Sequence, residues 1–314
     1  MKIERVVVFG HKPAQGRDFL GRKKRTHTHS YIHAGYFRAF SYLGYETYWL
    51  DGSTESLKDF PTAGTLFFTE DQADELIPLS ADSLYVTHSS SKTKYEEFGA
   101  KRLNLCNFVS DLEAGISYNY PGQTVQKLDS VTYFDAVSNA LYQPWATDLL
   151  PSEITDDLVQ KFDPSRRKIN YVGTIGHDNI ARRYLEFSKA AAKREVEVLL
   201  HSGVSDQQAR ELVRESLFTI DIRGDWHLER GYIPCRLWKN LSYGMSVSSN
   251  SQKLQSIFGD RVGFNPDASA LFETGLEKAA ATSAEEIRDN MSWIRESHTF
   301  VNRANRCLEL VTRH

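Results

Sequence analysis

The stretch 216–249 constrains the fold more than any other part of the chain. Residues 216–223 form an apolar run with the pattern of a buried strand, and residues 245–249 form a second one. Between them, residues 234–243 have helical spacing, with a proline suited to the first turn and a glycine just after the last. A strand, a loop, a helix and a second strand in so short a span predict a parallel crossover unit.

The same alternation of strands and helices runs through both halves of the chain. In the first half, strands are predicted at 5–9, 46–50, 65–68 and 83–87, and a helix at 30–43. In the second half, a strand that begins at 169 is followed by helix 180–193, strand 196–200 and helix 206–215. This order is typical of an α/β fold, in which helices cover both faces of parallel sheets.

The length of the chain indicates two domains. At 314 residues the chain exceeds one usual core and fits two domains of about 150 residues each. The sequence becomes polar and charged around 163–168, just before a new strand, and we place the linker there. We therefore expect one domain in residues 1–160 and a second in residues 161–314.

Composition excludes several classes of protein. A net charge of −3 and a sequence pI near 6.4 give no overall bias toward nucleic acid. The three cysteines, Cys106, Cys235 and Cys307, have no paired spacing, so neither a disulfide framework nor a zinc site is expected. The apolar run near the N-terminus is too short for a signal peptide, and no other run is long enough to span a bilayer. We expect a cytoplasmic protein.

The start of the helix near Pro234 is the first candidate for a binding site. The first N–H groups of a helix have no partner within it, so they can bind an anion. The preceding loop adds polar, charged and aromatic side chains at the same end. A nucleoside diphosphate is the natural anion for such a site.

Three segments carry a resemblance to a known family. They are Tyr171-Val-Gly-Thr-Ile-Gly176, Pro234-Cys-Arg-Leu-Trp-Lys-Asn-Leu-Ser-Tyr-Gly244 and His298-Thr-Phe-Val-Asn-Arg-Ala304. Across residues 169–314 the chain resembles the nucleotide-sugar domain of GT-B fold glycosyltransferases, and most of all their CgeB-like, group 1 branch. The resemblance implies two Rossmann-like domains that face a cleft, with the last ~20 residues crossing back to pack on the N-terminal domain. It also implies a nucleoside diphosphate sugar, with UDP or GDP as the expected nucleotide, and no required cofactor.

One position departs from the family pattern. At the donor helix the family has an arginine, two apolar residues and often a glutamate that holds the ribose of the donor. This chain has Arg236 and the apolar pair, but Lys239 stands where that glutamate would be. A lysine cannot accept the ribose hydroxyl protons and would instead pair with a phosphate or an acidic sugar.

The resemblance and the residue chemistry together predict the donor site. Arg223 and Arg236 would stabilise the diphosphate as it leaves, although both have the alternative of an ion pair with Asp221 or another nearby acid. Glu229 would contact sugar hydroxyls, with a solvated loop acid as the alternative. The full set of predicted nucleotide-sugar contacts is Gly173, Thr174, Arg223, Glu229, Tyr232, Pro234, Arg236, Lys239 and Asn240.

The first half supplies the candidate base. Three histidines, His27, His29 and His33, follow a basic run that ends at Arg25. A metal site is the weaker interpretation, because no cysteine or carboxylate nearby completes a tetrahedral set. An inverting transfer needs one group of near-neutral pKa to take the proton of the acceptor hydroxyl, and we assign this role to His29 first and His27 second. Arg25 and His33 are predicted to bind an acceptor that can be anionic.

Three functions remain open from the sequence. The leading one is a glycosyltransferase that moves a sugar from a nucleoside diphosphate sugar to a hydroxyl acceptor on a glycan, lipid or small molecule, without a metal and with inversion. The second is a DNA-base glucosyltransferase of the kind found in large bacteriophages, acting on hydroxymethylated bases; the absence of a global basic charge disfavours DNA. The third is a sugar-nucleotide-binding protein without catalytic activity.

Overall fold

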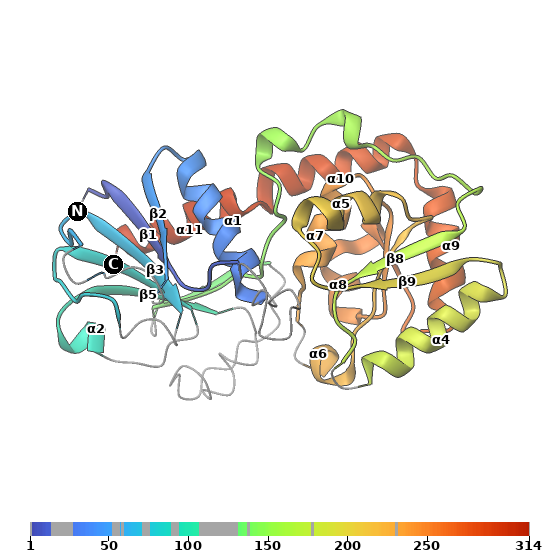
Figure 1. Ribbon diagram of the computed structural model, residues 1–314, viewed down its shortest axis with the longest axis horizontal. Helices are drawn as coiled ribbons and strands as arrows, with labels where there is room; N and C mark the ends of the chain where they lie inside the picture. Colours follow the sequence, from blue (N-terminus) through green and yellow to red (C-terminus); the bar gives the residue numbers. More distant parts are fainter. Residues whose placement is uncertain are drawn as a thin grey trace, which may run out of the picture. The chain divides into compact units, whose positions relative to one another are not determined.

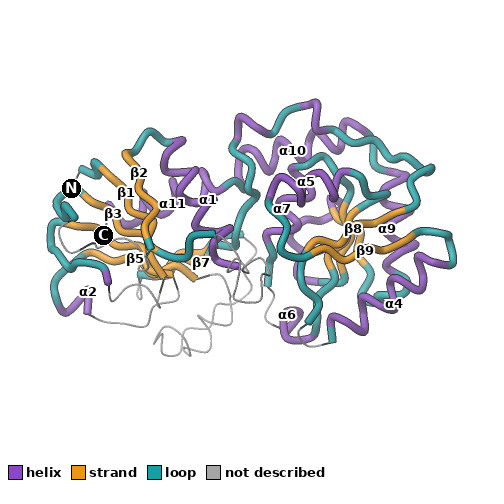
Figure 2. Tube along the Cα trace, viewed as in Figure 1, coloured by secondary structure: helices purple, strands orange, loops and turns teal. Residues whose placement is uncertain are grey.

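The structure is a computed structural model that describes residues 2–13, 28–51, 57, 60–70, 76–88, 94–106, 131–136, 139–176, 179–229 and 232–313. The contacts within the chain form two units, Met1–Trp145 with Phe300–His314, and Ala146–Thr299. Each unit has helices packed on mainly parallel strands (Figure 1 and Figure 2), which confirms the α/β fold class predicted from the sequence. The cleft between two domains stays a prediction.

The first unit contains a seven-stranded sheet with the order β2-β1-β3-β4-β5-β7-β6. Its strands are β1 (Arg5–Phe9), β2 (Glu46–Leu50), β3 (Thr65–Glu70), β4 (Ser83–His88), β5 (Lys101–Cys106), β6 (Tyr133–Asp135) and β7 (Ala140–Tyr142). All neighbours are parallel except β6 and β7. Since β2 and β3 pair with opposite edges of β1, the strand order reverses at β1.

Two helices from opposite ends of the chain pack together in the first unit (Figure 1). They are α1 (Thr28–Tyr42) and the last helix, α11 (Phe300–Arg313), while the short α2 (Lys94–Glu97) precedes β5. The ring of Tyr36 lies 4.2 Å from that of Phe68 in β3 and 5.0 Å from that of Phe300, measured between centroids. A Cβ at position 35 would lie 2.3 Å from the Phe300 ring, so Gly35 is what lets the two helices approach.

The second unit contains two parallel ladders, β9-β8 and β10-β11-β12. Their strands are β8 (Lys168–Val172), β9 (Glu197–His201), β10 (Thr219–Asp221), β11 (Val247–Ser249) and β12 (Val262–Phe264). The N–H of Leu217 donates to the carbonyl oxygen of Lys168 at 2.8 Å, and this bond sets β10 beside β8. The chain thus places β9 on one side of β8 and β10 on the other, so the strand order reverses at β8.

Seven α-helices are described in the second unit: α4 (Ile180–Ala192), α5 (Asp206–Arg214), α6 (Asp225–Glu229), α7 (Cys235–Ser242), α8 (Gln252–Phe258), α9 (Leu271–Ala281) and α10 (Ala284–Ser297). Single turns of 3-10 helix lie at Pro151–Glu153, Asp156–Leu158 and Gly259–Arg261. Phe187, Phe218 and Phe272 meet in the core at centroid distances of 5.8 to 6.4 Å. Aromatic packing of this kind joins α4 and α9 to the sheet.

Residues 146–160 pack on the second unit. The hydroxyls of Thr147 and Ser242 lie 2.7 Å apart, and the hydroxyl of Tyr243 donates to the carboxylate of Asp148. The contact boundary therefore lies after Trp145, whereas the polar composition of 163–168 had suggested a linker further along. Within the described ranges, no helix combines the length and the apolar character needed to cross a bilayer.

Candidate functional site

Three of the predicted donor residues, Gly173, Arg223 and Arg236, come together beside the carboxyl ends of β8 and β10. Gly173 directly follows β8, and Asp221 is the last residue of β10. The strand order reverses at β8, and open α/β sheets bind ligands beside the carboxyl ends of their strands at such a reversal. The hydroxyl of Tyr171 bridges the two strands by donating to the carbonyl oxygen of Ile222 at 3.2 Å.

Asp221 is the buried anion at the centre of this site. Its side chain is fully buried and accepts hydrogen bonds from Arg223 Nε at 2.9 Å, Arg236 Nη1 at 3.0 Å and the Ser249 hydroxyl at 3.3 Å. Burial alone would raise the pKa of this carboxyl, but the two guanidinium groups lower it below its ordinary value. One ionised carboxylate therefore fixes two cations.

Arg236, on the first turn of α7, is held by further contacts in addition to Asp221. Its Nε donates to the carbonyl oxygen of Val172 at 3.0 Å, and its Nη1 donates to the hydroxyl of Tyr171 at 2.8 Å. The guanidinium also lies 4.1 Å from the centroid of the Tyr171 ring. Its Nη2 donates no hydrogen bond to any residue in the described part of the chain. The group is thus rigidly placed and retains a donor for a ligand.

Gly173 makes room for this guanidinium. A Cβ at position 173 would lie 2.1 Å from Arg236 Nη2, and the glycine has a φ of +151°, which other residues rarely adopt. Its N–H donates to the carbonyl oxygen of His201 at 2.8 Å, so that N–H belongs to the β8-β9 ladder. The glycine therefore serves the site through the space that it leaves.

Arg223 is positioned through its main chain as well as its side chain. The side-chain amide of Asn250 accepts from the N–H of Arg223 at 2.8 Å and donates to its carbonyl oxygen at 3.0 Å. Arg183 Nη1 donates to the same carbonyl at 2.9 Å. The guanidinium lies 5.5 Å from the ring of Tyr232, whose hydroxyl pKa is raised to about 12 by burial. Arg183 lies in a segment that carries no motif, and no role was predicted for Asn250, which follows the predicted strand 245–249.

The other predicted donor residues differ in exposure. Pro234 is buried and precedes the first residue of α7, as its fixed φ suggested. Thr174 is exposed just beyond Gly173, and Glu229 is exposed at the end of α6. Asn240 is buried on α7. Their roles as donor contacts stay predictions.

Lys239 is bound by two carboxylates. Its Nζ lies 2.6 Å from Asp206 Oδ1 and 3.6 Å from Asp148 Oδ1. Burial alone would lower the pKa of this ammonium, but Asp148 and Asp206 hold it above its ordinary value. Lys239 thus ties α7 to α5 and to residue 148, and its contact with a phosphate or acidic sugar stays a prediction.

In the first unit, α1 carries two of the predicted residues. His29 is half-buried on the first turn, and His33 is buried one turn later. His27 and Arg25 lie outside the described residues. The ring of His29 lies 5.3 Å from that of His88, the last residue of β4, which the sequence analysis did not identify because an isolated histidine after a strand has no motif. Among the described residues, no group of three or more His, Cys, Asp or Glu side chains is placed to hold a metal ion.

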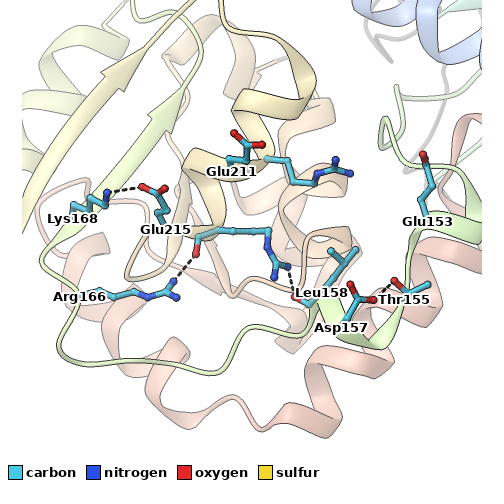
Figure 3. Close-up of a pocket in the computed structure, with 10 residues that line it drawn as sticks. Glu153, Thr155, Asp157, Leu158, Arg166, Lys168, Glu211 and Glu215 are labelled. Atoms are coloured by element: carbon cyan, nitrogen blue, oxygen red, sulfur yellow. Dashed lines mark hydrogen bonds and ion pairs between the residues drawn. The ribbon is translucent and has the colours of Figure 1, made fainter.

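A cavity of about 680 Å³ lies at the other end of the second unit's sheet, beside the amino end of β8 (Figure 3). Arg166 donates to the carbonyl oxygen of Arg214 at 2.6 Å, and Arg214 donates to that of Leu158 at 2.5 Å. Lys168 pairs with Glu215 at 2.6 Å. These cations stabilise the fold at the amino edge of the sheet, so we do not assign the cavity to the donor.

Comparisons with known proteins add the following findings. No protein-family model matches the chain, and no curated protein matches it. One similar solved structure is an alpha-glucosyltransferase in complex with UDP and a 13-mer DNA containing a central A:G mismatch, at 9% identity and a TM-score of 0.48 over 98% of this chain and 99% of that one. Another is the DNA modifying enzyme beta-glucosyltransferase, solved in the presence and absence of uridine diphosphoglucose, at 9% identity and a TM-score of 0.45 over 98% of both chains. At this identity the likeness concerns the fold alone, and the assignment to a CgeB-like branch stays a prediction.

Proposed function

We propose that the protein is a glycosyltransferase that transfers a sugar from a nucleoside diphosphate sugar to a hydroxyl acceptor. The observation that carries this proposal is the pair of guanidinium groups, Arg223 and Arg236, fixed by the buried Asp221 at the carboxyl end of β10. Two cations on one carboxylate leave a net positive charge of the kind that a diphosphate requires.

The chemistry follows from where the charge develops. As the bond between the anomeric carbon and the diphosphate breaks, negative charge grows on the leaving oxygen, and positioned donors stabilise that charge more than they stabilise the bound substrate. Arg236 is suited to this role because Tyr171, Val172 and Asp221 hold it while its Nη2 stays available among the described residues. The protein's own cations supply the stabilisation, so the proposal needs no metal.

On the acceptor side, we assign the general base to His29. Its imidazole takes the proton of the acceptor hydroxyl as that oxygen bonds to the anomeric carbon and the diphosphate leaves with the bonding electron pair. A single displacement of this kind inverts the anomeric configuration. The support for His29 is its half-buried place on the first turn of α1, near the carboxyl end of β1.

Calorimetric titration with UDP, GDP and ADP tests the donor site, and turnover of the corresponding sugar nucleotides tests catalysis. We expect one nucleoside diphosphate to bind with a Kd in the micromolar range and its sugar nucleotide to be consumed when an acceptor is present. Acceptor arms with a glycan, a lipid and DNA that carries hydroxymethylated bases distinguish the leading function from the DNA-base alternative. Binding without turnover of any sugar nucleotide would indicate a sugar-nucleotide-binding protein, and no binding would refute the proposal.

A further inference from the structure

Four histidines converge at the carboxyl end of the first unit's sheet. His88 ends β4, His29 and His33 lie one turn apart on α1, and His11 follows β1. The ring centroids of His29 and His88 are 5.3 Å apart, those of His29 and His33 6.3 Å, and those of His11 and His33 6.5 Å. Three segments distant in sequence thus bring four imidazoles together near β1, where the strand order reverses.

The packing around these rings fixes their positions. His33 and His88 are only 1% and 4% exposed. A Cβ at Gly10 would lie 2.2 Å from the His33 ring, so the end of β1 contacts the imidazole directly. The His88 ring meets Trp145 at a centroid distance of 4.8 Å. The fold therefore sets the positions of these imidazoles.

The chemistry of the cluster favours an oxyanion as its ligand. Imidazoles titrate near pH 6.5, and neighbouring imidazoles resist gaining several positive charges unless an anion compensates them. Two charged residues lie at this end of the sheet, Lys12 after β1 and Asp51 after β2, and their charges are opposite in sign. The side chain of Glu70, at the end of β3, lies outside the described part. No trio among the described residues is placed for a metal ion.

We propose that His11, His29, His33 and His88 form an oxyanion site that binds a phosphate group carried by the acceptor. The site defines the acceptor class as a phosphorylated molecule, and this identification of the ligand as the acceptor rests on the proposed function. Binding draws protons onto the imidazoles, because a dianion stabilises their charged forms. His11, His33 and His88 carry these protons in the acceptor complex, so His29 remains neutral and can take the proton of the acceptor hydroxyl.

NMR of the histidine Cε1–H resonances tests the site with sulfate, which stays a dianion between pH 5 and 8, so any pH dependence comes from the protein. We expect sulfate to shift the resonances of the four clustered rings among the ten histidines of the chain and to bind about tenfold more tightly at pH 6 than at pH 8. Glycerol phosphate, a hydroxyl-bearing phosphate monoester, should shift the same resonances. If inorganic phosphate shifts them and the ester does not, the ligand is a free anion and the acceptor assignment is wrong.

Variants separate this site from the donor site. His88→Gln and the less buried His11→Gln should each weaken sulfate binding at pH 6 about tenfold. The matched control is His201→Gln in the second unit, whose ring pairs with Asn170, and it should change nothing. Arg236→Gln should leave the pH-dependent binding intact, so a failure of the donor proposal is distinguishable. Equal sulfate binding at pH 6 and pH 8 would overturn the proposal, and so would full sulfate binding in both cluster variants. If zinc shifts the four histidine resonances and sulfate does not, the cluster is a metal site and the proposal is also wrong.

Discussion

Replacing Arg236 by Gln is the sharpest test of the donor site. The substitution keeps a polar side chain of similar shape but removes the charge that Asp221 and Tyr171 hold in place. Arg223 remains on Asp221, so the carboxylate keeps one cation. We therefore expect a folded protein whose affinity for a nucleoside diphosphate is reduced.

The magnitude follows from what Nη2 can donate. A hydrogen bond from a charged donor to a phosphate oxygen contributes about 1.5–3 kcal/mol, which corresponds to a loss of roughly 10- to 150-fold in Kd. The effect lies at the upper end of this range if Nη2 contacts the leaving oxygen directly. Loss of the bond to Asp221 should also lower the free energy of unfolding by about 1–3 kcal/mol. Affinity must therefore be measured at a temperature where the variant remains folded.

Calorimetry with the nucleoside diphosphate that binds the parent protein is the assay, and two further variants sharpen it. Gly173→Ala keeps the charge but puts a Cβ 2.1 Å from the present position of Nη2, so it should weaken binding by displacing the guanidinium. Arg194→Gln is the matched control, because this exposed arginine pairs with Glu273 away from the site. We expect it to bind like the parent.

Two results would refute the assignment. If Arg236→Gln binds the nucleotide as tightly as the parent does, the guanidinium only neutralises Asp221 and stabilises the fold. If Gly173→Ala and Arg194→Gln weaken binding equally, the effect is general and does not come from this site.

Three further predictions concern stability and catalysis. Asp221→Asn leaves two guanidinium groups around a neutral side chain and should lower the free energy of unfolding by about 3–5 kcal/mol at pH 7. Because the native pKa of Asp221 is lowered, its carboxylate contributes to the free energy of unfolding above the unfolded pKa of about 3.9, and this contribution is lost as pH falls through the native pKa. In urea denaturation, the stabilities of the parent and of Asp221→Asn should therefore converge below about pH 4. A difference that stays constant with pH would contradict the charge argument. His29→Ala should keep nucleotide affinity and reduce turnover by roughly 10²–10⁴, and the parent's first product should be inverted when followed by NMR; full turnover or retention would remove the base assignment. Phe300→Ala should destabilise the protein by about 3–5 kcal/mol, because this side chain is 5% exposed and packs on Gly35 and Tyr36; an unchanged melting temperature would show that α11 adds little to the first unit.

Local sequence patterns predicted most of the elements. The helix expected at 180–193 is Ile180–Ala192, and the strand expected at 83–87 is Ser83–His88. Hydrophobic periodicity and helix-ending residues act over a few positions, so a single stretch of sequence contains them. Strands β5, β6, β7 and β12 were not predicted, whereas β10 and β11, which are also three residues long, lie within longer apolar runs that marked them.

The sequence also singled out candidate donor residues but left their contacts undecided. For Arg236 it offered both a phosphate contact and an ion pair with Asp221, and both interpretations draw on the same charge. The fold shows that the ion pair exists and that it leaves Nη2 available among the described residues. It also pairs Lys239 with Asp206 and Asp148, which no spacing in the sequence suggested.

By itself, then, the sequence determined the α/β class, the order of most elements and the polar, arginine-bearing start of α7, because these depend on neighbours along the chain. The tertiary structure decided which distant side chains meet: His29 with His88, Gly173 with Arg236, and α11 with α1. Such meetings depend on strand order and register, which arise from the packing of many weak contacts at once. A reversal of strand order at β1 and at β8 is what turns scattered polar residues into two candidate sites.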